Sequence, residues 1–79
     1  MKDVRWIDDV KQALKSLGGK AHLSKIYGKV REIREQRKSP LGEYEAWVRY
    51  TLQQNSRGRG QDLFEPFRIR SGIWLLKKR

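Results

Sequence analysis

The stretch EYEAWVRYTLQQNSRGRGQDLFEPFRIRSGIWLLK, residues 43–77, decides the fold that the sequence predicts. Its first part, 43–55, spaces its apolar residues along one face of a helix. Its last part reads as two strands, 62–67 and 73–77, and residues 68–72 between them end in glycine, as a hairpin turn does. The stretch therefore predicts a helix followed by an antiparallel hairpin.

The segment between that helix and the hairpin is basic and rich in glycine. Residues 56–61, SRGRGQ, contain no apolar side chain, so we expect a flexible loop. Pro66 lacks the N–H that a central strand donates, so the strand that contains it is expected at an edge or in irregular form.

Two more helices are predicted upstream. Apolar residues recur at helical spacing between Val4 and Leu17, at Trp6, Ile7, Val10, Ala13, Leu14 and Leu17. Gly18 and Gly19 then supply the left-handed residue that ends a helix. A second stripe follows a short extended entry at Ala21 and His22 and consists of Leu23, Ile26, Tyr27, Val30 and Ile33. Residues 36–42 contain Pro40, which disfavours helix at the preceding residue, so they are expected to form a connection.

Length and composition limit the classes of protein that this chain represents. At 79 residues it is expected to form a single domain, 1–79, with a thin core. Nineteen Lys and Arg against nine Asp and Glu give a net charge of +10, which favours polyanionic partners. There is no Cys and no apolar run of about 18 residues, so we expect neither disulfides nor a membrane span, and a cytoplasmic location.

The sequence offers little that would support catalysis. His22 is the only imidazole, and no metal-ligand spacing, phosphate-binding glycine loop or nucleophile motif occurs. We expect no enzyme activity, no cofactor, no metal and no small-molecule substrate.

Three helices followed by a two-stranded antiparallel hairpin are the plan of an α+β winged helix-turn-helix. In that plan the third helix enters the major groove, and the hairpin, or wing, approaches the backbone or minor groove. The charges agree with this interpretation, since residues 37–79 carry ten Lys and Arg against four acids, or +6, while 1–36 carry +4.

The third predicted helix has an aromatic outer face. Steps of about 100° per residue put Tyr44, Val48, Thr51, Leu52 and Asn55 on the core side. Trp47, Tyr50 and Gln54 point outward, and a Trp and a Tyr left in water favour a partner surface. In an alternative interpretation, Trp47 leans back over the connection before the helix and is half core. Trp6 and Trp74 are expected in the core.

Three blocks of sequence carry a resemblance to a known family. They are the segment from Trp6 to Tyr27, the segment VRYTLQQNS at 48–56, and the segment from Asp62 to Leu75. Together they resemble the C-terminal winged-helix domain of DpnI-type, methyl-directed restriction endonucleases and related prokaryotic modules. The resemblance implies binding of duplex DNA in the nucleoid and, in several members, reading of N6-methyladenine through the third helix. The nuclease domain of that family has no counterpart here.

The candidate DNA contacts follow from the outer face, the arginines and this resemblance. They are Tyr44, Trp47, Arg49, Tyr50, Gln53, Gln54, Asn55, Ser56, Arg57, Arg59, Arg68, Arg70 and Ser71. Arginine presents a planar fork that suits phosphate, although these arginines are also compatible with a merely solvated surface.

Methylation of adenine N6 removes a hydrogen-bond donor and adds a small apolar group to the major groove, which a Trp side chain complements better than Gln. Three hypotheses remain: a reader of N6-methyladenine, a winged-helix regulator of unmodified DNA, and a protein- or RNA-interaction module. With no segment left over for a dimerisation helix, we expect a monomer.

Overall fold

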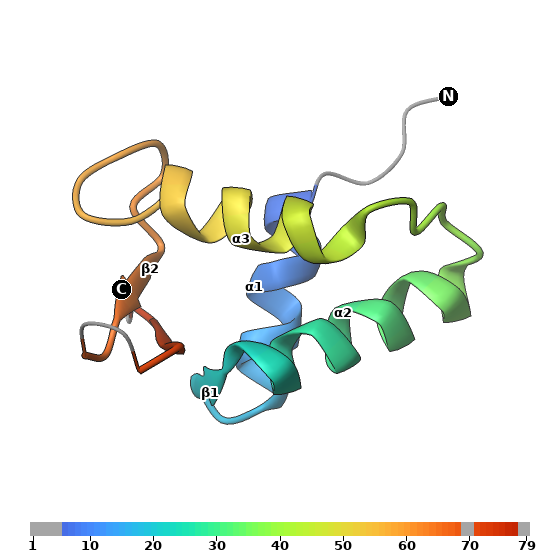
Figure 1. Ribbon diagram of the computed structural model, residues 1–79, viewed down its shortest axis with the longest axis horizontal. Helices are drawn as coiled ribbons and strands as arrows, with labels where there is room; N and C mark the ends of the chain where they lie inside the picture. Colours follow the sequence, from blue (N-terminus) through green and yellow to red (C-terminus); the bar gives the residue numbers. More distant parts are fainter. Residues whose placement is uncertain (1–5, 69–70, 78–79) are drawn as a thin grey trace.

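A computed structural model describes residues 6–68 and 71–77 of the chain (Figure 1). These residues form three helices and three short strands, in the order α1 (Trp6–Ser16), β1 (Lys20–His22), α2 (Leu23–Arg37), α3 (Tyr44–Gln54), β2 (Phe64–Pro66) and β3 (Ile73–Leu76). The described part is therefore a small α+β fold, with three helices and an antiparallel sheet.

The sheet has three strands, so the prediction of a two-stranded hairpin alone was wrong. The segment expected as an extended entry is a strand, β1, and pairs with β3 so that Lys20 faces Leu75 and His22 faces Ile73. On the other side of β3, Phe64 of β2 faces Leu76. With the order β1-β3-β2, the edge position expected for the Pro66 strand is confirmed. Three residues are too few to display the alternation that identifies a strand in a sequence.

The helix ends follow the local chemistry of the sequence. Gly18 and Gly19 have φ of 92° and 90°, and Gly19 N–H donates to the Leu14 carbonyl, so the predicted glycine stop after α1 is confirmed. Helix α2 continues to Arg37, beyond the expected start of the connection at residue 36. It ends because Lys38 adopts a left-handed conformation, with φ of 62°, just before the Ser-Pro pair.

One core joins the helices to the sheet. Its buried apolar residues come from all three helices, from β2 and from the residue before β2: Val10, Ala13, Leu14, Ile26, Val30, Val48, Leu52, Leu63 and Phe64. Trp6 and Trp74, expected in the core, pack against it but are only half buried. This small core fixes α3 over α1 and sets one end of α3 beside the hairpin.

Candidate nucleic-acid interface

Helix α3 presents a continuous exposed face. Val48, Thr51 and Leu52 are buried on its inner side, which leaves the opposite side free of the core. There Trp47 is 49% and Tyr50 56% exposed. The side chains of Gln53 and Gln54 continue this face toward the C-terminal end of the helix, and both are exposed. Two large aromatic groups followed by two amides thus lie along one accessible surface.

Trp47 is held in place by aromatic neighbours. Its ring stacks on Trp6 of α1, with centroids 6.3 Å apart and planes 6° from parallel. Tyr50 meets the same ring edge to face, at 5.9 Å and 87°. The indole is therefore not free in solvent, and the ring that supports it belongs to α1. Half of it is supported from α1, and the other half remains available.

A groove of about 610 Å³ lies between the end of α3, the loop at 56–61 and the hairpin, the group of elements at the left of Figure 1. Trp74, Ile73 and Pro66 from the hairpin contribute its apolar lining. The other residues that line it are polar or small: Gln53, Ser56, Arg57, Arg59, Arg68 and Gly72. Gln53 belongs both to this groove and to the exposed face of α3, so the two surfaces are contiguous.

The loop that carries two of the groove arginines is tied to itself and to α3. Arg59 N–H donates to the Ser56 carbonyl at 3.0 Å, and Asp62 N–H donates to the Arg59 carbonyl at 2.8 Å. Gln61 N–H donates to Asn55 Oδ1 at 3.0 Å, and Gly58 N–H donates to Asp62 Oδ1 at 2.9 Å. The flexible loop expected from the glycines is thus a bonded turn, because side-chain acceptors on either side satisfy its backbone.

Within the described chain, the arginines fall into two groups. Those on the helices bond to oxygen atoms of the fold: Arg31 to Glu35, Arg34 and Arg37 to Asp9, and Arg49 to the Tyr27 hydroxyl. In the groove, Arg57, Arg59 and Arg68 form no ion pair with a described carboxylate, and Arg68 lies 5.3 Å from the Phe67 ring centroid. Unpaired guanidinium groups are therefore concentrated around the groove.

Arg49 lies away from the aromatic face. Its Nη1 donates to the Tyr27 hydroxyl on α2 at 3.0 Å, and this hydrogen bond raises the pKa of the Arg49 guanidinium above its ordinary value. Arg49 therefore stays charged beside α2, on a different side of α3 from Trp47.

Several candidate contacts have other partners in the structure. Ser56 is 3% exposed and donates to the Gln53 carbonyl, and the Asn55 side chain bonds to the Thr51 carbonyl and to Gln61 N–H. The Ser71 hydroxyl donates to the Arg68 carbonyl and accepts from Ile73 N–H, which shapes the hairpin turn. In the structure these three residues shape the loop and the hairpin turn, and their role as DNA contacts stays a prediction.

Two other candidates are placed differently. Tyr44 is half-buried at the start of α3. The hydrogen bond to Glu35, and to a smaller extent Tyr44, raises the pKa of the Arg31 guanidinium above its ordinary value. Arg70 lies outside the described residues.

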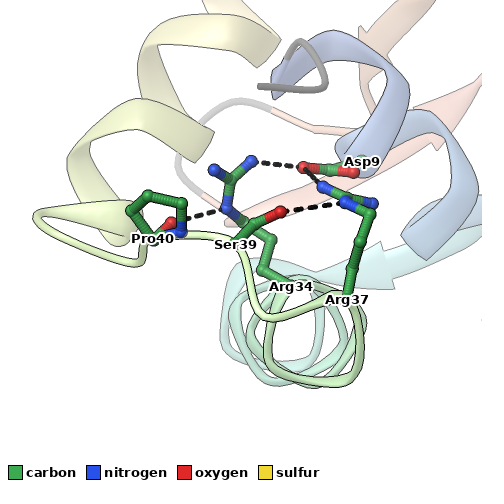
Figure 2. A network of polar contacts seen from close by, with 5 residues as sticks. All are labelled: Asp9, Arg34, Arg37, Ser39 and Pro40. Atoms are coloured by element: carbon green, nitrogen blue, oxygen red, sulfur yellow. Dashed lines mark hydrogen bonds and ion pairs between the residues drawn. The ribbon is translucent and has the colours of Figure 1, made fainter. Parts of the chain in front are cut away.

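Sequence reasoning missed a buried charged cluster behind the aromatic face. Asp9 and Arg34 are each 1% exposed, and Arg34 Nη1 donates to Asp9 Oδ2 at 2.5 Å (Figure 2). A signal was present, because Asp9 and Arg34 both fall on the apolar stripes of their helices, at positions that otherwise hold core residues such as Ala13 and Val30. Opposite charges at two core positions indicate a buried pair.

No protein family, no curated protein and no solved structure matches the chain. Among residues 6–68 and 71–77, His, Asp and Glu nowhere gather in a group of three suited to a metal ion. In the same residues, none of the helices combines the length and the apolar character needed to cross a bilayer.

Proposed function

We propose that this chain is a winged helix-turn-helix module that binds duplex DNA and favours N6-methyladenine. In this proposal α3 enters the major groove with Trp47 and Tyr50 toward the base edges, and the groove beside it takes a strand of the phosphate backbone. The β2–β3 hairpin acts as the wing. The module works by binding alone, as a monomer on prokaryotic chromosomal DNA.

The observation that carries the proposal is the distribution of unpaired arginines. Arg57, Arg59 and Arg68 surround a groove that adjoins the exposed face of α3, while the described arginines elsewhere bond to oxygen atoms of the protein. A free guanidinium fork pairs well with phosphate, and phosphate contacts fix the register of a protein on DNA. A basic groove next to an outward helix face is the arrangement that such binding requires.

The preference for a methyl group rests on Trp47. A recognition helix contacts base edges mainly through its N-terminal residues, and Trp47 lies in the first half of α3. The exposed half of its indole offers apolar surface. An N6-methyl group makes more apolar contact with this surface than unmethylated adenine does. Burial of one methyl group contributes about 0.8 kcal/mol, so two methyl groups in a palindrome give about a tenfold preference.

The backbone contact is tested by the salt dependence of binding. If five to seven basic side chains neutralise phosphates, a plot of log K against log salt should have a slope of about −4.5 to −6. Changing Arg57, Arg59 and Arg68 together to Gln should flatten the slope by about 2.7 and weaken all duplexes alike.

The matched control removes three charges elsewhere, at the exposed positions Lys11, Lys15 and Arg31, which do not line the groove. It should flatten the slope much less. Equal effects of the two triple variants would reduce the groove to one basic surface among several, and a wild-type slope near zero would refute nucleic-acid binding.

The methyl preference is tested by titrating wild type and Trp47→Ala onto one duplex with and without N6-methyl groups. Loss of the indole should abolish a difference of about 1–2 kcal/mol in binding free energy between the methylated and the unmethylated duplex. Val48→Ala, a change in the buried core, is the control, since it should lower the melting temperature and keep this difference. A wild type that shows no preference is a DNA-binding module without methyl recognition.

A further inference from the structure

A chain of contacts leads from the buried charged cluster to the proposed DNA-binding face. Arg34 of α2 bonds to Asp9 of α1, and its guanidinium carbon lies 3.7 Å from the centroid of the Trp6 ring. Trp6 in turn stacks on Trp47, the exposed indole of α3. Four contacting side chains therefore join the interior of α1 and α2 to the outer surface of α3.

The same arginine also holds the segment that leads into α3. Arg34 Nε donates to the Pro40 carbonyl at 2.8 Å, and the neighbouring Arg37 bonds to Asp9 Oδ2 and to Ser39 Oγ, each at 2.9 Å (Figure 2). Ser39 and Pro40 lie in the connection between α2 and α3. The cluster thus fixes both the path of this connection and the ring on which Trp47 rests.

Stability alone does not account for this arrangement. Apolar residues of similar volume often replace a buried ion pair with no loss of stability, because the charges must be stripped of water. An apolar side chain at position 34, however, would make neither the bond to the Pro40 carbonyl nor the cation–π contact to Trp6. What distinguishes arginine here is that one planar group binds Asp9, the Pro40 carbonyl and the Trp6 ring at fixed angles.

We propose that Arg34 and Trp6 are positioning residues that hold Trp47 in the orientation in which it meets DNA. This inference rests on the proposed function. An exposed indole with no support would sample several rotamers and lose that freedom on binding, whereas a stacked one has already lost it. Immobilising one such side chain costs about 0.5–1.5 kcal/mol, which corresponds to about a two- to tenfold difference in affinity.

The test follows Trp47 directly in the full chain. The sequence contains three Trp, so a 5-fluorotryptophan-labelled protein gives three resonances, and Trp47→Phe assigns the one of interest. In Trp6→Leu the Trp47 resonance should narrow and move toward that of an exposed indole. Binding to a methylated duplex should fall about two- to tenfold, with a smaller fall for the unmethylated duplex.

Three further variants separate positioning from folding. Arg34→Lys keeps a cation beside Asp9 but lacks the planar group over Trp6, so it should show a partial form of the same changes. Trp6→Phe keeps an aromatic ring, so its Trp47 resonance and its affinity for the methylated duplex should both stay close to those of wild type. Leu17→Ala removes a residue that packs against the core, so it should lower the melting temperature while the Trp47 resonance and the methyl preference stay as in wild type.

The outcomes distinguish the inference from the function on which it rests. If wild type binds duplex DNA and Trp6→Leu, folded at the temperature used, matches it in affinity and in the Trp47 resonance, the positioning role is refuted and DNA binding stands. If wild type binds no duplex, the proposed DNA binding and the positioning role are both refuted. If Leu17→Ala reproduces the changes of Trp6→Leu, loss of stability explains them and positioning is again refuted.

Discussion

Replacing Asp9 by Ala should remove about 3–5 kcal/mol from the free energy of unfolding, because it takes the Asp9 carboxylate away from the buried guanidinium of Arg34. Asp9 and Arg34 are each 1% exposed, so water has almost no access to the charge that remains. Arg37 loses its bond to the same Asp9 oxygen. A domain of this length has a total stability of about 4–12 kcal/mol, so the change consumes a large part of it. The melting temperature should fall by at least about 12 °C.

The assay is thermal and urea unfolding followed by circular dichroism, with Asp8→Ala as the matched control. Asp8 is the exposed neighbour on the same helix, and its loss should change stability by no more than about 0.5 kcal/mol. The pair Asp9→Leu with Arg34→Met removes both charges and should recover most of the loss. A loss of less than about 1 kcal/mol in Asp9→Ala, or a double variant no more stable than the single one, would show that Asp9 does not compensate the buried charge of Arg34.

Three further predictions concern the groove and the assembly. Arg57 has a left-handed backbone, with φ of 54°, which glycine adopts without strain. Arg57→Gly should therefore keep the free energy of unfolding within about 1 kcal/mol of wild type, while its DNA affinity in a titration falls. A variant that loses stability together with affinity would contradict the role of Arg57 in binding. At Gly60, with φ of 54°, a Cβ would collide with Asn55 Oδ1 and the Gln54 carbonyl. Gly60→Ala should therefore lower the free energy of unfolding in urea by about 2 kcal/mol and weaken DNA binding. A variant with wild-type stability would show that the loop is not held by these contacts. Sedimentation at tens of micromolar should give a monomer, and a stable dimer without DNA would favour a symmetric regulator instead.

The helices were predictable because their signals are local. Apolar spacing located all three, and the glycine pair at 18–19 located the end of α1. The third strand was not predictable, since β1 exists only through its pairing with β3, more than fifty residues later in the sequence. Partners distant in sequence leave no trace in a three-residue segment.

The same difference between local and long-range signals applies to the candidate site. The outward aromatic face was predictable from helical geometry, because this face depends on the sequence of α3 alone. Helical geometry did not identify Ser56 as buried or Asn55 as a support for the loop, since both roles depend on how residues 56–62 fold back on the end of α3. The support of Trp47 by Trp6 depends on the packing of α1 against α3, which spacing within one helix does not reveal.

One competition experiment with the wild-type chain tests directly whether α3 reads N6-methyladenine in duplex DNA. A labelled duplex carrying N6-methyladenine is displaced by the same duplex without methyl groups and, separately, by double-stranded RNA of the same sequence. We expect the unmethylated duplex to compete about tenfold less well, because it lacks the two methyl groups that the complex buries. We expect RNA to compete far less well still, because the deep and narrow major groove of A-form RNA excludes a helix. RNA that competes as well as the methylated duplex would contradict the assignment of α3 to the major groove of DNA.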